Sequence, residues 1–210
     1  MKQIICYGDS NTFGFNPQDG SRYDANTRWT GILAKILGDK FNVIEEGFNN
    51  RTGFFVNPEG YLQSGQKYLP ECLEKNKCFE IFIIALGTND LQKFFKMDAD
   101  IVKKGLENLI KIVRSFNSEA RLILIPPVVL NENILKGNFS HQFDEKSIYA
   151  SVWVQAIYKT VADKNDCEFM DLNKYVEPSV VDGLHFDKES HKLIAKLLAE
   201  RVLNERCLRG

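Results

Sequence analysis

A serine, a histidine and an aspartate in this sequence have the chemistry that acyl transfer requires. Ser10 stands near the start of the chain, whereas Asp182 and His185 stand near its end. A serine hydroxyl is a weak nucleophile until a base takes its proton, and histidine titrates close to neutral pH. From three residues earlier, Asp182 could reach back to the imidazole and fix its tautomer, as the acid of a triad does.

Hydrogen-bond donors for the oxyanion of a tetrahedral intermediate occur at three places. The candidates are the Ser10 backbone N–H, an N–H near Asn50 and the side-chain amide of Asn89. Each motif alone has a plainer explanation, because a serine after Gly-Asp commonly caps a helix and residues 87–90 could form an ordinary turn. Catalysis is favoured because the segments occur together, in one order.

Asp182 and His185 could also form a cap or bind a metal ion. No further cluster of histidine, cysteine or aspartate accompanies the pair, so no metal site is expected. The other two histidines, His141 and His191, are expected at the surface.

The elements that must position these residues follow from hydrophobic patterning. Short apolar runs that end near Gly, Pro or Asp are typical of buried parallel strands, and they lie at 4–7, 43–44, 81–86, 122–125 and 169–170. Because helical patterns alternate with these runs, we expect a parallel sheet covered on both faces. Ligands bind beyond the carboxyl ends of such strands, where the polar segments lie.

Helices are predicted from apolar residues three and four positions apart. The expected buried faces are Trp29, Ile32, Leu33, Ile36 and Leu37; Val102, Leu106, Leu109, Ile110 and Val113; Tyr149, Val152, Trp153, Ala156 and Ile157; and Ile194, Leu198 and Val202. Gly38 is expected to end the first helix, and Asp187 to cap the last. A shorter helix is predicted to begin near Tyr68, because Pro70 is tolerated only in a first turn.

Composition and charge exclude several classes of protein. The chain has 210 residues, 44% of them hydrophobic, so it can bury a core without disulfides, and we expect one domain over residues 1–210. The 27 Lys and Arg balance 28 Asp and Glu, so a nucleic-acid partner is not indicated. Five scattered cysteines are expected to be reduced thiols. No membrane span or signal peptide is visible, so a cytoplasmic location is expected.

Together these segments resemble the SGNH hydrolase superfamily, also called GDSL esterases and lipases. Its four blocks are matched by residues 8–11, 47–53, 87–90 and 182–185. Additional segments resemble the arylesterase and acyltransferase branch, and they lie at 28–31, 44–47, 68–73 and 126–127. The match covers essentially the whole chain, and the combined motif is specific although no single block is.

The resemblance implies a fold and a mechanism. The fold is a flavodoxin-like α/β/α sandwich of three layers, with five parallel strands in the order 2-1-3-4-5. Ser10 would be the nucleophile, His185 the general base and acid, and Asp182 its orienting partner. Ser10, Asn50 and Asn89 would form the oxyanion hole. Members need no cofactor; they hydrolyse esters or thioesters, and some pass the acyl group to an alcohol.

The sequence departs from the family pattern in two blocks. Asn11 stands where the GDSL motif has leucine, a change that many members tolerate. Asn50 stands where the family has the oxyanion-hole glycine. Because asparagine tolerates a left-handed backbone better than most residues, its N–H could still point inward. Gly47 is the alternative for this role.

Phe15 and Leu184 are expected to line a small apolar pocket, which favours short acyl chains such as acetyl. We therefore expect a serine esterase that acts on small-molecule esters and forms an acyl-enzyme on Ser10. A carbohydrate O-deacetylase of the same mechanism is the alternative. A flavodoxin-like nucleotide-binding module, with a phosphate at the loop after the first strand, would leave Asn89 and His185 without a role.

Residues 128–144 are predicted to form a long surface loop. This loop could carry a subunit contact of a homo-oligomer through Phe139 and Phe143. Its alternatives are a mobile lid and plain exposure to solvent.

Overall fold

A five-stranded parallel sheet forms the centre of the computed structural model, which describes residues 1–56, 60 and 62–204. The strand order is β2-β1-β5-β6-β7. The strands are β1 (Lys2–Gly8), β2 (Phe41–Gly47), β5 (Ile81–Ala85), β6 (Arg121–Ile125) and β7 (Glu168–Phe169). Counted along the chain, this is the predicted order 2-1-3-4-5, and the predicted fold class is confirmed. β3 (Arg51–Thr52) and β4 (Gln63–Ser64) pair separately.

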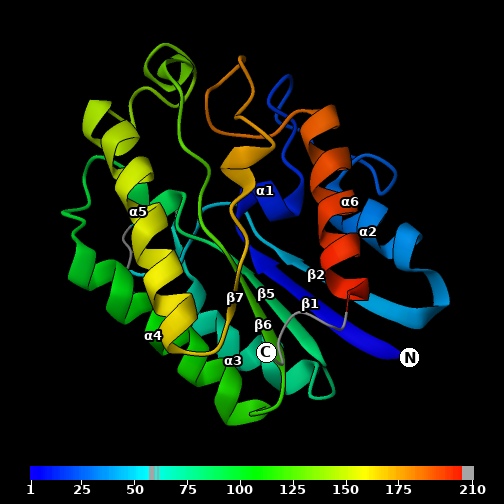
Figure 1. Ribbon diagram of the computed structural model, residues 1–210. Helices are drawn as coiled ribbons and strands as arrows, with labels where there is room; N and C mark the ends of the chain where they lie inside the picture. The colour runs from blue at the N-terminus through cyan, green and yellow to red at the C-terminus, as the bar shows by residue number, and fades with distance from the viewer. Residues whose placement is uncertain (57–59, 61, 205–210) are drawn as a thin grey trace.

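Helices cover both faces of the central sheet (Figure 1). On one face lie α3 (Gly65–Lys75), α4 (Ala99–Phe116) and α5 (Glu145–Lys164), and on the other lie α2 (Trp29–Leu37) and α6 (Lys188–Leu203). Side chains of β1 alternate between the two resulting cores, with Ile5 and Tyr7 in the first and Ile4 and Cys6 in the second. Burial on both faces explains why the strands read as continuous apolar runs.

Several predicted helix features are confirmed. All five apolar residues expected on the inner face of α4 are buried. The Asp187 carboxylate caps α6 by accepting the N–H of Ser190 at 2.8 Å. Gly38 ends α2 with a φ of 54°, a left-handed conformation that favours glycine. Ile36 is the exception on α2, since it is exposed.

The predicted buried face of α5 is wrong. Tyr149 and Val152 are 71% and 51% exposed, and the inner face consists of Ser147, Ser151, Val154, Tyr158, Val161 and Ala162. Polar groups on that inner face have tertiary partners: the Ser151 hydroxyl accepts the N–H of Leu130, and the Tyr158 hydroxyl donates to the carbonyl of Leu86. Because serine and tyrosine are among the buried residues, the spacing of apolar residues did not predict this face.

The predicted start of α3 is also wrong. The helix begins at Gly65, where the Ser64 hydroxyl accepts the N–H of Lys67, and Pro70 lies inside it. A proline there removes one hydrogen bond to the preceding turn. Burial of Leu69 and Leu73 against the sheet offsets that loss.

Residues 128–144 are not simply a surface loop. They contain the short helix η3 (Glu132–Leu135), and Leu130, Ile134 and Phe143 are buried in the core. Burial of Phe143 contradicts its expected place in a subunit contact. Phe139 is only partly buried.

Cys6, Cys72, Cys78 and Cys167 are free thiols, and Cys207 lies outside the described residues. In the part of the chain that the structure describes, no helix has the length and apolarity to cross a membrane.

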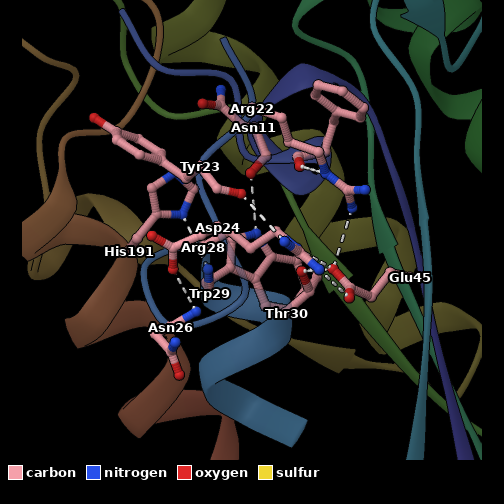
Figure 2. Close-up of polar contacts among 11 residues, drawn as sticks. Asn11, Arg22, Tyr23, Asp24, Asn26, Arg28, Trp29, Thr30, Glu45 and His191 are labelled. Carbon is pink, nitrogen blue, oxygen red and sulfur yellow. Dashed lines mark hydrogen bonds and ion pairs between the residues drawn. The ribbon is translucent and has the colours of Figure 1, made fainter.

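His191 is buried between α6 and α2, which contradicts its predicted surface position, whereas His141 is exposed as predicted. The Nδ1 of His191 accepts the backbone N–H of Trp29 at 3.2 Å. Figure 2 shows this contact. The ring also packs edge-on against Tyr23 and Phe186. Burial lowers the pKa of His191 to about 4.

Replacement of Tyr158 by phenylalanine should destabilise the fold. The variant leaves the buried carbonyl of Leu86 without its 2.7 Å hydrogen bond, which costs about 1–3 kcal/mol. Urea unfolding would measure this loss. Tyr149→Phe on the exposed face of the same helix is the control, and it should change stability by less than about 0.5 kcal/mol. Equal effects of both changes would contradict the assignment of the buried face.

His191 should make the protein sensitive to acid. The unfolded chain binds a proton on this histidine below pH 6.5, but the folded chain binds it only below about pH 4. The free energy of unfolding should therefore fall by about 3 kcal/mol on this account as pH drops through that window. Unfolding measured at several pH values should give a shallower slope for His191→Gln than for the wild type. Lys196→Gln, on the exposed face of α6, is the control, and an unchanged slope in His191→Gln would refute the effect.

Candidate active site

The predicted site residues meet at the carboxyl ends of the parallel strands. Ser10 begins the short helix α1 (Ser10–Phe13) directly after β1, and Asn50 follows β2. Asn89 begins η2 (Asn89–Leu91) shortly after β5. His185 lies in the irregular segment between η4 (Leu172–Lys174) and α6.

Ser10, His185 and Asp182 form a continuous hydrogen-bonded chain. The Oγ of Ser10 lies 2.9 Å from Nε2 of His185, and Nδ1 of His185 lies 2.7 Å from Oδ2 of Asp182. All three residues are buried. With the Nδ1 proton directed at the carboxylate, Nε2 is the nitrogen that can accept the serine proton.

Asp182 is held as an ionised carboxylate. Its Oδ1 accepts the N–H groups of Leu184 and His185, both at 3.0 Å. Burial opposes ionisation, but the imidazole of His185 and these two N–H groups outweigh it and lower the pKa of Asp182. The carboxylate is therefore charged at neutral pH and can orient the imidazole and stabilise its protonated form.

The Ser10 N–H lies at the start of α1, where backbone N–H groups have no intrahelical acceptor. Asp9 caps this helix by accepting the N–H of Asn11 at 3.0 Å, while the N–H of Ser10 is in the first turn and has no intrahelical acceptor. Helix and strand pack so closely that a Cβ on Gly8 would lie 2.0 Å from Oγ1 of Thr12. Only glycine fits this position.

Asn50 and Asn89, the other two residues predicted for the oxyanion hole, line one cavity with Ser10. Asn50 has a φ of 63°, the left-handed backbone expected of a residue in the place of the family glycine. The amide of Asn89 donates one hydrogen to the Arg51 carbonyl, and its oxygen accepts from Gln92. These bonds fix the amide and leave its second hydrogen for a ligand. Gly47, the alternative to Asn50, packs instead against the backbone of α1.

Two buried charged residues that had no predicted role hold the loop around Asn50. The Asp90 carboxylate accepts the N–H groups of Gly53, Phe54 and Phe55 at 2.6, 2.8 and 3.2 Å. Burial raises the pKa of Asp90 to about 6 despite these bonds. The guanidinium of Arg51 donates to the carbonyls of Gly8 and Glu46 and lies over the ring of Tyr7. Arg51 and Asp90 stand within two of the segments that resemble the family motifs, 47–53 and 87–90. Only their tertiary contacts reveal that they stabilise this loop.

A cavity of about 340 Å³ opens onto Ser10 and His185. Its lining consists of Ser10, Phe15, Asn49, Asn50, Asn89, Phe139, Gln142, Leu184 and His185. Phe15 and Leu184 line the cavity as predicted, and the ring centroids of Phe15 and His185 lie 4.2 Å apart. Asn49, Phe139 and Gln142 are additional, and Phe139 comes from the loop for which a subunit contact was expected.

Metal-binding side chains do not gather at this site or elsewhere in the described part of the chain. Within residues 1–56, 60 and 62–204, no group of three or more His, Cys, Asp or Glu is placed to hold an ion.

Comparisons with known proteins identify the family of this chain. A model of the GDSL-like lipase/acylhydrolase family matches residues 6–193. A carbohydrate acetylesterase from Sinorhizobium meliloti is 27% identical, with a TM-score of 0.87 over 96% of this chain and 98% of that one. The M. smegmatis aryl esterase is 29% identical, with the same TM-score over 96% and 98% of the two chains. A search of curated proteins found no match. The chain therefore belongs to the GDSL-like lipase/acylhydrolase family, and it is a carboxylic ester hydrolase.

Proposed function

We propose that this enzyme hydrolyses small, short-acyl esters through an acyl-enzyme on Ser10, with His185 as general base and acid and Asp182 as its orienting partner. The observation that carries the proposal is the chain of contacts from Ser10 Oγ to His185 Nε2 and from His185 Nδ1 to Asp182, at 2.9 and 2.7 Å. A nucleophile within reach of its base, and a base held by a third group, are the requirements of this chemistry.

Acylation follows from these positions. His185 Nε2 takes the proton of Ser10 as Oγ attacks the ester carbonyl carbon, and the carbonyl oxygen becomes an oxyanion. The N–H groups of Ser10 and Asn50 and the free amide hydrogen of Asn89 stabilise that charge. His185 then gives its proton to the alkoxy oxygen, the ester C–O bond breaks and the alcohol leaves. Water repeats the sequence on the acyl-enzyme and releases the acid.

The cavity walls support a short acyl group. The apolar part of the lining consists of Phe15, Phe139 and Leu184. The ring centroids of the two phenylalanines lie 6.1 Å apart, and both rings pack beside that of His185. Apolar side chains this close to the imidazole would contact the acyl group of an ester bound at Ser10.

A carbohydrate O-deacetylase is the second candidate. The side chains of Asn49, Asn50 and Gln142 also line the cavity, and amides can donate to and accept from the hydroxyl groups of a sugar. One of the similar structures is a carbohydrate acetylesterase. Assembly into a homo-oligomer and a cytoplasmic location stay predictions.

Loss of the Ser10 hydroxyl should abolish turnover. Ser10→Ala should lower kcat for p-nitrophenyl acetate by about 10⁴-fold or more, because the nucleophile is removed. A fluorophosphonate should label the wild-type protein once, at Ser10, as mass spectrometry of its peptides would show. Ser118→Ala, at an exposed serine, is the control. Turnover in Ser10→Ala equal to that of the control would refute the mechanism.

Acyl-chain length should decide the rate. For p-nitrophenyl esters of two to about twelve carbons, kcat/KM should be highest for acetate if Phe15 and Phe139, which line the cavity beside Ser10, form the wall of the acyl site. Phe139→Ala should shift the preference toward longer chains. Highest activity on long chains in the wild type would contradict a short-acyl pocket. A preference for acetylated sugars over alkyl acetates would favour the second candidate.

A further inference from the structure

Asn11, the residue after Ser10, contacts both peptide groups that flank His185. Its side-chain Nδ2 donates to the carbonyl of Leu184 at 3.3 Å, and its Oδ1 accepts the N–H of Phe186 at 3.1 Å. Asn11 and the two peptide groups are buried, and the contacts join positions 173 and 175 residues apart in the sequence. A single amide thus connects the helix of the nucleophile to the backbone of the base.

The backbone around His185 has no regular structure to hold it. Asp182 accepts the N–H groups of Leu184 and His185, and the carbonyl of His185 accepts the N–H of Ser179 at 2.7 Å. These three bonds lie within the same irregular segment. The two bonds to Asn11 satisfy the remaining polar groups from Leu184 N–H to Phe186 N–H, and they also anchor the segment to α1.

Asn11 is itself held in place from two directions. Its N–H donates to Asp9, and its carbonyl accepts the indole N–H of Trp29 at 3.1 Å. Figure 2 shows how the backbone N–H of Trp29 in turn meets His191 of α6, the helix that follows the segment of His185. Hydrogen bonds therefore connect α1 to α2 and α2 to α6, and α6 continues directly from the segment of His185.

We propose that Asn11 is a positioning residue that sets the distance and direction between Ser10 Oγ and His185 Nε2. The proposal rests on the catalytic roles of Ser10 and His185 proposed above. The GDSL motif has leucine here, and leucine has a similar size but neither a donor nor an acceptor. A leucine at position 11 would leave the Leu184 carbonyl and the Phe186 N–H buried without partners, so this segment would relax to satisfy them.

The effect should appear in the chemical step and not in substrate binding. Asn11 does not line the cavity of Ser10, so its replacement should leave KM nearly unchanged. Proton transfer from Ser10 to His185 depends on an aligned contact, and a displacement of about 1 Å can cost about 10²-fold in rate. A residue that served stability alone would lower the free energy of unfolding without lowering kcat per folded active site.

The test compares Asn11→Leu and Asn11→Asp with the control Asn117→Leu. Asn117 also donates to one backbone carbonyl, that of Phe79, and accepts one N–H, that of Glu119, but it lies before β6 at the opposite end of the sheet. Asn11→Asp keeps the acceptor for Phe186 and loses the donor for Leu184. For each variant, kcat and KM on p-nitrophenyl acetate are measured per active site titrated with a fluorophosphonate, together with urea unfolding.

Asn11→Leu should lower kcat by about 10²-fold with KM nearly unchanged, Asn11→Asp should also lower kcat, and Asn117→Leu should lose stability but keep its kcat. Wild-type kcat in Asn11→Leu, or an equal loss in Asn117→Leu, would overturn the proposal. If Asn11→Leu does not fold, Asn11→Asp decides, and a wild-type kcat there would also overturn it. Ser10→Ala, with its rate normalised to protein concentration because it has no site to titrate, separates the outcomes, since turnover without Ser10 would refute the catalytic roles themselves.

Discussion

The contact between the Ser10 hydroxyl and the His185 imidazole sets the strictest requirement on how this chain must fold. It joins residues 175 positions apart and places both in a buried site. Only a fold that returns the end of the chain to its beginning can make that contact. The parallel sheet does this, because its strands all point the same way and their carboxyl ends meet along one edge.

Loops at that edge are irregular, so their backbone polar groups need side-chain partners. Buried charged and amide groups provide them: Asp90 and Arg51 hold the loop around Asn50, while Asp182 and Asn11 hold the segment of His185. An unpaired buried polar group costs about 1–3 kcal/mol, which explains why so many polar side chains are found inside this site. Stability of the loops and placement of the reacting groups are consequences of the same bonds.

A second set of polar contacts holds the segment before α2. Arg28 forms two hydrogen bonds with Glu45 of β2, and Arg22 and Thr30 donate to the same carboxylate (Figure 2). Burial alone would raise the pKa of Glu45, but Arg28 and Thr30 lower it. The carboxylate therefore stays ionised and ties this segment to the sheet. Through Trp29, the same segment reaches Asn11 and the active site.

Apolar runs and spaced motifs are local patterns, so they predicted the five strands of the central sheet and the residues proposed for the triad, and the family resemblance predicted the order of those strands. The sequence by itself did not reveal the inner face of α5, the start of α3 or the burial of His191. In each case a residue that a local pattern would exclude is stabilised by a group distant in the sequence. Tyr158 donates a hydrogen bond to the Leu86 carbonyl, and His191 accepts one from the Trp29 N–H. Pro70 lies in α3, whose leucines pack against the sheet. Tertiary structure alone revealed that Phe139 lines the cavity of Ser10, and that Asn11 and Asp90 bind the backbone of two active-site loops. The reason is that a hydrogen bond depends on distance and direction, which sequence spacing does not record.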